Sequence, residues 1–307
     1  MIDNKKYASY WIKDLHQNLI EQTCDPNMLN NVCINNKPEA PFDVTPVYFS
    51  REVLSKYYNA PHKYSVKDGC IKFIEEGFEM RVDTDMRDYV AVILVDLAFL
   101  DYNEQCYWRS YNIQPDENTT ISKAAYRRWY EGDFAQPSAP DAILVQEYRQ
   151  LYANWETNFG WHLFTVDPED KKSVLYSLHM LSDDNNEREF YEQVLNITKL
   201  FIDSLNVKQF PKLDEKENSK GLKRLDAYFK ENGINAHGMI DFLRNLQSLR
   251  SKGAAHPGSI DKKVADYFGI GKNTYGYIIG SIFATLVKVI ETLQEIGDKI
   301  KSKNKRD

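Results

Sequence analysis

Hydrophobic positions in the second part of the chain recur with helical spacing. Apolar residues lie three or four positions apart throughout 190–205, and again over about seven turns in 275–300. Shorter stripes with the same spacing occupy 174–181, 222–229, 239–249 and 264–268. Glycine, proline and polar residues separate these stripes. The pattern predicts an antiparallel all-α helical bundle over 168–300.

The first part of the chain has a different pattern. Three short segments, 70–74, 78–82 and 89–97, are rich in Val, Ile, Phe and Tyr and are separated by glycine and aspartate residues, which is typical of an antiparallel meander. The segment 89–97 is apolar nearly throughout, as in a central strand covered on both faces. Apolar residues at helical spacing predict helices at 7–22 and 48–58. An α+β region with a small antiparallel sheet is therefore expected.

Length and composition favour two domains. A chain of 307 residues with 42% hydrophobic residues can bury two separate cores. The expected division is an α+β recognition or regulatory domain over 1–167, a helical domain over 168–300 and a basic tail over 301–307. The four cysteines form no C-x-x-C pair, the chain begins without an apolar leader, and polar residues interrupt its longest apolar stretch. These features predict a cytoplasmic protein with reduced thiols and no membrane span.

Charge is unevenly distributed along the chain. The net charge of −6 gives no general electrostatic affinity for nucleic acid. Residues 1–167 carry 16 basic and 25 acidic side chains, whereas residues 168–307 carry 23 and 20, so the two parts have charges of −9 and +3. The helical part is therefore the expected place for a phosphate-binding surface.

Aromatic and arginine residues are concentrated between Cys106 and Phe134, and two interpretations are open. Arg109, Arg127 and Arg128 stand beside rings that could stack on unpaired bases. The same rings could instead fill the seam between the sheet and its helices, with arginine stems packed over them. The acidic charge of this part of the chain favours packing.

The most distinctive segment of the chain ends the helical stripe at 239–249. It reads Leu249-Arg-Ser-Lys-Gly-Ala-Ala-His256, with Arg250 at the margin of the apolar stripe and small residues beside it. The ordinary pKa of histidine suits it to accept a proton near neutral pH, and the planar guanidinium of arginine binds phosphate oxygens without losing its charge. Arg250 and His256 are therefore a candidate pair for metal-independent cleavage of RNA by its own 2′-hydroxyl.

This R-x(5)-H spacing resembles the motif of the HEPN superfamily. The resemblance covers the helical part of the chain and implies a metal-independent endoribonuclease that acts as a homodimer on RNA, with Arg250 and His256 as catalytic residues and no cofactor. Spacing alone adds Arg244 and Lys252 as phosphate or RNA contacts. The histidines show no H-x-x-x-H or H-E-x-x-H spacing, so no metal site is expected. By analogy with HEPN proteins, a toxin-like effector in antiviral defence is one biological role.

Two alternatives remain open at the level of sequence. A non-catalytic HEPN domain would use the same arginine and histidine to hold a nucleotide or RNA phosphate. A dimerisation or scaffold protein would use the stripe at 275–300 as an interface, and Arg250 and His256 would only cap the end of their helix. The segments 48–58, 62–69 and 104–112, and the strand that ends at 95–97, are similar to segments of uncharacterised bacterial proteins that precede HEPN-like helices. The first 165 residues are therefore expected to sense or position something, or to restrain the enzyme, and a regulatory protein partner is a further expectation.

Overall fold

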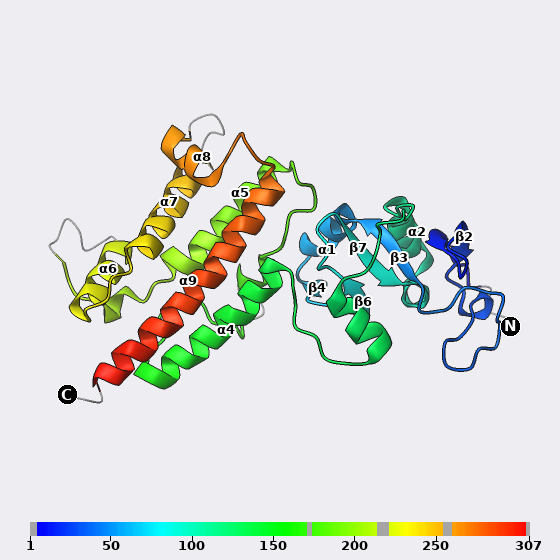
Figure 1. Ribbon diagram of the computed structural model, residues 1–307, viewed down its shortest axis with the longest axis horizontal. Helices are drawn as coiled ribbons and strands as arrows, with labels where there is room; N and C mark the ends of the chain where they lie inside the picture. Colours follow the sequence, from blue (N-terminus) through cyan, green and yellow to red (C-terminus); the bar gives the residue numbers. More distant parts are fainter. Residues whose placement is uncertain (1–4, 171–173, 214–220, 254–259, 305–307) are drawn as a thin grey trace. The chain divides into compact units, whose positions relative to one another are not determined.

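The computed structural model describes residues 5–170, 174–213, 221–253 and 260–304, and it divides into two compact units (Figure 1). The units are Met1–Ala139 and Pro140–Asp307. The sequence predicts the division after residue 167. The difference arises from helix α4, Pro140–Phe159, which packs along helix α9 and so belongs to the second unit.

The first unit is built on antiparallel sheets, as the sequence predicted. The strands β3 (Pro46–Ser50), β7 (Tyr89–Ile93), β6 (Phe78–Asp83), β5 (Cys70–Phe73) and β4 (Tyr64–Lys67) form one five-stranded sheet in that order. Every neighbouring pair in it is antiparallel. The predicted meander is thus confirmed, and β3 and β4 extend it at its two edges. The segment predicted as a strand over 89–97 leaves the sheet at Ile93 and continues as a 3-10 helix, Leu94–Phe99.

Strand β7 is buried on both faces of this sheet, which explains its nearly continuous apolar sequence. Val90 and Val92 belong to a core that includes Trp108 of helix α2 (Tyr102–Ser110). Ala91 and Ile93 face the other way, into a smaller cluster. That cluster contains Ala125 of α3 (Lys123–Tyr126) and Trp129 of the π-helical turn Arg127–Glu131. The expectation of a central strand is therefore correct.

Of the two helices predicted in the first unit, the one at 7–22 was wrong and the one at 48–58 was correct only from residue 51 onward. Residues 7–22 form a hairpin instead, with β1 (Ser9–Lys13) paired to β2 (Leu19–Thr23). Alternate residues of β1 are buried, and the Asp14 carboxylate accepts hydrogen bonds from the backbone N–H groups of His16 and Asn18 at 2.8 Å, which closes the turn. The apolar residues of this segment fit a helical spacing and a strand spacing equally well. Residues 48–50 are the end of strand β3, and a 3-10 helix (Arg51–Leu54) and the short α1 (Ser55–Tyr58) follow.

Every named element of the second unit is helical. After α4 come α5 (Glu187–Thr198), a π-helical segment Lys199–Asp203, α6 (Gly221–Glu231), α7 (His237–Gly253), α8 (Lys262–Phe268) and α9 (Tyr275–Asn304). Short 3-10 turns lie at Val174–Ser177 and Val207–Gln209. Helix α9 packs against α4 and α5, while α7 contacts α5, α6 and α8 (Figure 1). Gly233, two residues after the end of α6, and Gly269, directly after α8, adopt positive φ angles of 76° and 74°, at the predicted helix ends.

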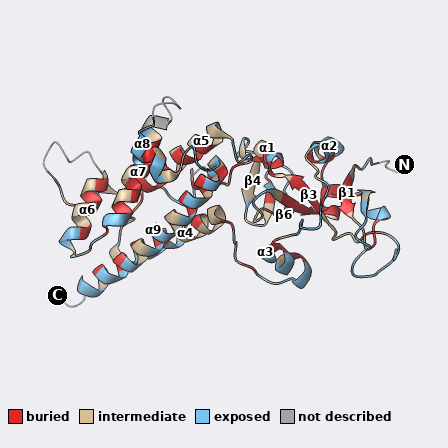
Figure 2. Ribbon diagram, turned by 45° about the horizontal axis from the view of Figure 1, so that its top comes forward, coloured by how far each residue is buried: buried red, intermediate tan, exposed pale blue. Residues whose placement is uncertain are grey.

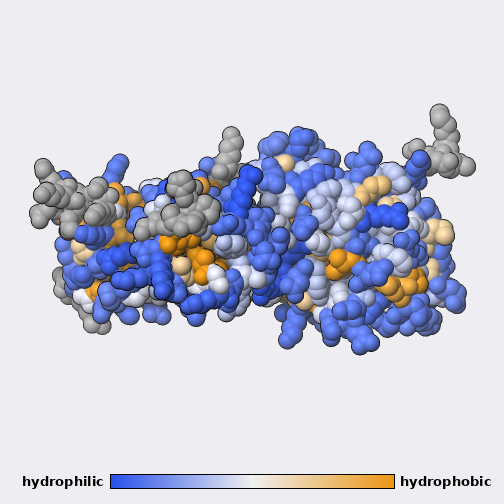
Figure 3. All heavy atoms as spheres, turned by 90° about the horizontal axis from the view of Figure 1, so that it is seen from above, coloured by the Kyte–Doolittle hydropathy of each residue, from blue (hydrophilic) through white to orange (hydrophobic). Residues whose placement is uncertain are grey.

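Helix α9 shows how the long apolar stripe is used. It is the one described helix that is long and apolar enough to cross a membrane, although half of its most apolar stretch is buried inside the protein. Its exposed positions form a narrow stripe that widens after Asp298: Tyr277, Ser281, Ala284, Lys288, Glu291, Glu295, Asp298, Lys299, Ser302 and Lys303. The alternation of buried and exposed turns is visible along α9 in Figure 2. Hydrophilic residues cover most of the face drawn in Figure 3, with separate hydrophobic patches. The burial of half of the most apolar stretch of α9 is consistent with a soluble protein. The helix also continues through most of the predicted tail, to Asn304.

Candidate functional site

Helix α7 positions the arginine of the R-x(5)-H motif. Leu243, Leu246 and Leu249 are buried, with exposed fractions of 2% or less, which confirms the predicted apolar stripe. Arg250 follows directly and lies four residues after Leu246, so it falls on the flank of this stripe. Its side chain is 31% exposed. The guanidinium therefore lies at the edge of the helical core with access to solvent.

Arg250 forms an ion pair with Asp203, at the end of the π-helical segment after α5. Its Nη1 donates a hydrogen bond to Oδ2 of Asp203 at 2.5 Å. Asp203 is 43% exposed, so this contact lies at the surface of the second unit. Asp203 was not among the residues that the sequence singled out. No local signal could have found it, because 47 positions separate it from Arg250.

The other residues of the predicted site are only partly placed. Lys252 lies in the last turn of α7, but its side chain belongs to the part of the chain that the structure does not describe. His256 lies outside the described residues altogether. The structure therefore places Arg250 and leaves the pairing of Arg250 with His256 as a prediction.

Arg244 is placed away from Arg250 and is already engaged. Its guanidinium contacts Asp241 at 3.1 Å and Asp226 of α6 at 3.4 Å. Lys230 also contacts Asp226, at 3.0 Å, so two basic and two acidic groups balance one another here. Six residues separate Arg244 from Arg250, which on an α-helix is about 9 Å of rise and roughly 120° of rotation. The two arginines therefore lie on different faces of α7, and Arg244 is a weaker candidate for a phosphate contact than its spacing suggested.

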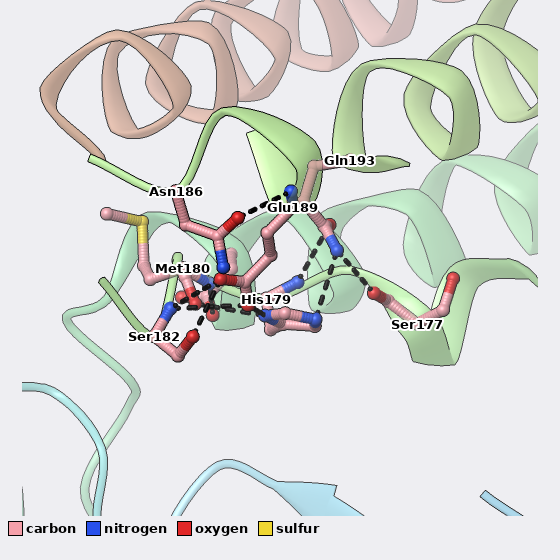
Figure 4. A network of polar contacts seen from close by, with 8 residues as sticks. Ser177, His179, Met180, Ser182, Asn186, Glu189 and Gln193 are labelled. Carbon is pink, nitrogen blue, oxygen red and sulfur yellow. Dashed lines mark hydrogen bonds and ion pairs between the residues drawn. The ribbon is translucent and has the colours of Figure 1, made fainter. Parts of the chain in front are cut away.

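A buried histidine that the sequence analysis did not favour lies at the centre of a polar network (Figure 4). His179 is 8% exposed. Its Nδ1 lies 2.9 Å from the carbonyl oxygen of Met180, and its Nε2 lies 3.0 Å from Nε2 of Gln193. A carbonyl oxygen can only accept and an amide nitrogen only donates, so this arrangement requires the neutral tautomer with the proton on Nδ1. The imidazole has a partner on both nitrogens.

The network joins the segment before α5 to that helix. Gln193 accepts a hydrogen bond from the backbone N–H of His179 at 3.2 Å and donates one to the carbonyl of Ser177 at 3.1 Å. Glu189 accepts hydrogen bonds from both the backbone and the hydroxyl of Ser182. Because these groups satisfy one another inside the protein, we assign His179 a structural role. The dispersed histidines of the sequence gave no indication of it.

The arginines between Cys106 and Phe134 all have acidic partners. Arg128 forms a two-pronged contact with Asp68, at 2.9 and 2.6 Å. Arg109 lies 3.7 Å from Glu21, and Arg127 pairs with Asp133. Two tryptophans of the segment, Trp108 and Trp129, are buried. These contacts favour the packing interpretation, although the rings of Tyr126 and Phe134 are exposed.

Metal ligands do not gather in the described part of the chain. No group of three or more His, Cys, Asp or Glu side chains there is arranged to hold a metal ion. All four cysteines are free thiols, with Cys24 buried and Cys33 and Cys106 exposed. Burial raises the pKa of the Cys24 thiol to about 12, so this thiol stays protonated near neutral pH.

Comparisons with known proteins leave the family open. The sequence matches no protein-family model, and neither the curated proteins nor the solved structures include one with significant similarity to it. The resemblance to the HEPN superfamily therefore depends on the motif around Arg250 and on the helical character of the second unit.

Proposed function

We propose that this protein is a metal-independent endoribonuclease of the HEPN type. The observation that carries the proposal is the position of Arg250. This residue begins the R-x(5)-H motif near the end of an amphipathic helix, in a unit built of helices, and its guanidinium is solvent-accessible at the edge of the core. A fixed cation at such an edge can meet a phosphate without being buried.

In the proposed reaction the RNA supplies its own nucleophile. The imidazole of His256 takes the proton of a ribose 2′-hydroxyl, and the 2′-oxygen attacks the adjacent phosphorus. Arg250 stabilises the negative charge that develops on the non-bridging oxygens. The bond from phosphorus to the 5′-oxygen breaks, and that oxygen takes up a proton from an imidazolium. The products are a 2′,3′-cyclic phosphate and a 5′-hydroxyl. In a homodimer of the HEPN type, the second copy of His256 supplies this proton.

The charge of the last part of the chain favours a substrate that carries phosphates. Residues 168–307 have a net charge of +3, whereas the whole second unit, which also includes α4, carries 24 basic and 24 acidic side chains and is neutral. The first unit would then recognise a signal or a partner, or restrain the helical unit. A toxin-like role in defence against phage is the corresponding biological proposal, by analogy alone.

Cleavage of a mixed RNA substrate in EDTA tests the proposal. The wild type is compared with His256→Ala and Arg250→Ala. Two matched controls are His237→Ala, whose imidazole is 75% exposed, and Arg188→Ala, whose guanidinium is 89% exposed. Arg188 lies near the start of α5, about 22 Å along the helix from Asp203. We expect 2′,3′-cyclic phosphate ends from the wild type and both controls, and a loss of cleavage in the two motif variants. Unchanged cleavage by His256→Ala would refute the assignment.

The ion pair between Arg250 and Asp203 supports a second candidate function, that of a scaffold protein. The contact between Arg250 and Asp203 joins α7 to the end of the π-helical segment, which is also what a purely structural arginine would do. A scaffold predicts that Arg250→Ala changes stability and leaves RNA binding unaffected. A non-catalytic binding module predicts salt-sensitive RNA binding that weakens in Arg250→Ala, without cleavage.

A further inference from the structure

Helix α5 continues into an irregular turn, and the last residue of that turn, Asp203, contacts the arginine of the motif. The last turn of α5 widens into the π-helical segment Lys199–Asp203, where the N–H of Ser204 donates to the carbonyl of Lys199 at 3.1 Å, five residues back. Leu200, Phe201 and Ile202 are consecutive and all buried. Successive residues of a regular α-helix point about 100° apart, so burial of three in a row requires core on both sides of this turn. Wide turns of this kind are frequent at functional sites.

Asp203 is the residue at which this widened turn reaches the surface. The three residues before it are in the core, whereas its carboxylate is 43% exposed and accepts the hydrogen bond from Nη1 of Arg250. The wide turn therefore holds a carboxylate at the flank of α7, beside the one motif side chain that the structure describes.

The contact occupies only part of the guanidinium. Arginine has five N–H donors in a planar fork, and among the described residues only Nη1 of Arg250 has a hydrogen-bond partner. Nε and Nη2 have no partner in that part of the chain. A guanidinium held at one corner has lost much of its rotational freedom, but it can still donate to a phosphate oxygen from its other nitrogens. Arg244 differs in this respect, because two carboxylates share its guanidinium.

Stability alone is a poor explanation of this pair. Both side chains are partly exposed, and ion pairs at the protein surface contribute little to the free energy of unfolding because water and salt screen them. Orientation is a larger effect, since a displacement of about 1 Å in a catalytic group can lower a rate by roughly 100-fold.

We infer that Asp203 is a positioning residue of the nuclease site, whose carboxylate fixes the Arg250 guanidinium so that its other N–H groups face the scissile phosphate of RNA. The inference rests on the proposed ribonuclease function. Asp203 itself touches neither the RNA nor the proton that moves. Its negative charge weakens RNA binding, whereas its hold on Arg250 raises the rate of the chemical step.

The experiment separates binding from turnover in the full-length protein. Binding is measured by fluorescence anisotropy with a labelled RNA whose 2′-hydroxyls are methylated, so that it cannot be cleaved. Turnover is measured as kcat on the unmodified RNA. The variants are Asp203→Ala, Asp203→Asn and Asp203→Glu. Asp298→Asn, on the exposed face of α9, is the matched control for loss of one negative charge. Circular dichroism and thermal unfolding confirm that each variant is folded.

The expected result is a split between kcat and affinity. In Asp203→Ala, kcat falls by roughly 10- to 100-fold, while the dissociation constant for the methylated RNA is unchanged or lower. Asp203→Glu recovers part of kcat because it restores the carboxylate, and Asp298→Asn behaves as the wild type. In an Arg250→Lys background, removal of Asp203 lowers kcat much less than in the wild type, because the two residues act as one unit.

Two results would overturn the inference, and they differ from failure of the proposed function. Wild-type kcat in Asp203→Ala, while Arg250→Ala is inactive, would show that Asp203 does not position Arg250. A fall in kcat that only follows the folded fraction of each variant would assign the ion pair to stability. If the folded wild type cleaves no RNA at all, the proposed function itself fails, and the inference fails with it.

Discussion

A Cβ atom at Gly276 would lie 1.9 Å from Oδ1 of Asp184 and 3.1 Å from the Cα atom of the same residue. Gly276 is the second residue of α9, and its N–H donates to the carbonyl of Asp184 at 2.9 Å. The Asp184 carboxylate in turn accepts a hydrogen bond from the Thr274 hydroxyl at 3.2 Å. The start of α9, the longest helix, thus packs closely against the loop before α5. Only glycine at position 276 leaves room for this contact.

Gly276→Ala is therefore expected to destabilise the protein. The carboxylate of Asp184 could rotate away from the methyl group, but its Cα atom at 3.1 Å could not, and overpacking of this kind costs about 1–3 kcal/mol. Gly280→Ala is the control, because its Cβ would approach only the flexible end of Met180, at 3.1 Å. Chemical denaturation should show a lower midpoint for Gly276→Ala and an equal or higher one for Gly280→Ala. Equal stability of the two variants would contradict the close approach.

Gln193→Leu should destabilise the second unit through the His179 network. Leucine has a similar volume but removes the hydrogen bonds that Gln193 makes to Nε2 of His179, to the backbone N–H of His179 and to the carbonyl of Ser177. Each buried group that loses its partner costs about 1–3 kcal/mol, so a loss of about 3 kcal/mol or more in the free energy of unfolding is expected. Glu192→Leu, at the exposed neighbouring position, should stay within about 0.5 kcal/mol of the wild type. A neutral effect of Gln193→Leu would mean that the network does not form.

Removal of α4 should prevent the second unit from folding. Leu144, Tyr148, Leu151 and Trp155 of α4 are buried, with 2% exposure or less. Burial of each large side chain contributes about 1.5–3 kcal/mol, so the four together contribute roughly 6–12 kcal/mol, which is comparable to the whole stability of an ordinary domain. A fragment of residues 140–307 should unfold cooperatively in circular dichroism. A fragment of 168–307, cut at the boundary predicted from sequence, should aggregate or remain molten. Cooperative unfolding of the shorter fragment would show that α4 is dispensable.

Buried tyrosines should make the protein unfold in strong alkali. Burial raises the pKa of Tyr10, Tyr57 and Tyr148 above the usual value of 10. Their contribution to stability is complete below pH 10. It is lost as the pH rises above 10, because the unfolded state then releases protons that the folded state retains.

Each such tyrosine lowers the free energy of unfolding by about 1.4 kcal/mol per pH unit in that range. A titration followed by absorbance at 295 nm should show these phenols ionising together with unfolding, after the exposed tyrosines. Tyr148→Phe should make the pH dependence less steep, because it removes one phenol whose pKa burial raises. Ionisation of all tyrosines near pH 10 in the folded protein would contradict this expectation.

The sequence by itself determined the elements whose signals are local. The apolar stripes along α5, α7 and α9 and the glycine helix ends at Gly233 and Gly269 could be predicted from neighbouring residues. The meander of β5, β6 and β7 could be predicted in the same way. The motif arginine could also be placed at the margin of its helix, because a spacing of three or four residues determines which side chains share a face.

Tertiary structure decided what depends on residues far apart in the chain. Helix α4 belongs with α9 because their apolar faces fit each other, which no spacing within α4 could reveal. The spacing of apolar residues in the segment 9–23 is compatible with a helix and with a strand. The segment forms a hairpin, in which Tyr10 and Ile12 are buried on one face of β1. Asp203 meets Arg250 only after a widened turn brings it to the flank of α7. Local periodicity depends on neighbouring residues and can therefore be recognised in the sequence. Contacts between distant residues depend on how whole helices and strands pack together, which no single segment of the sequence specifies.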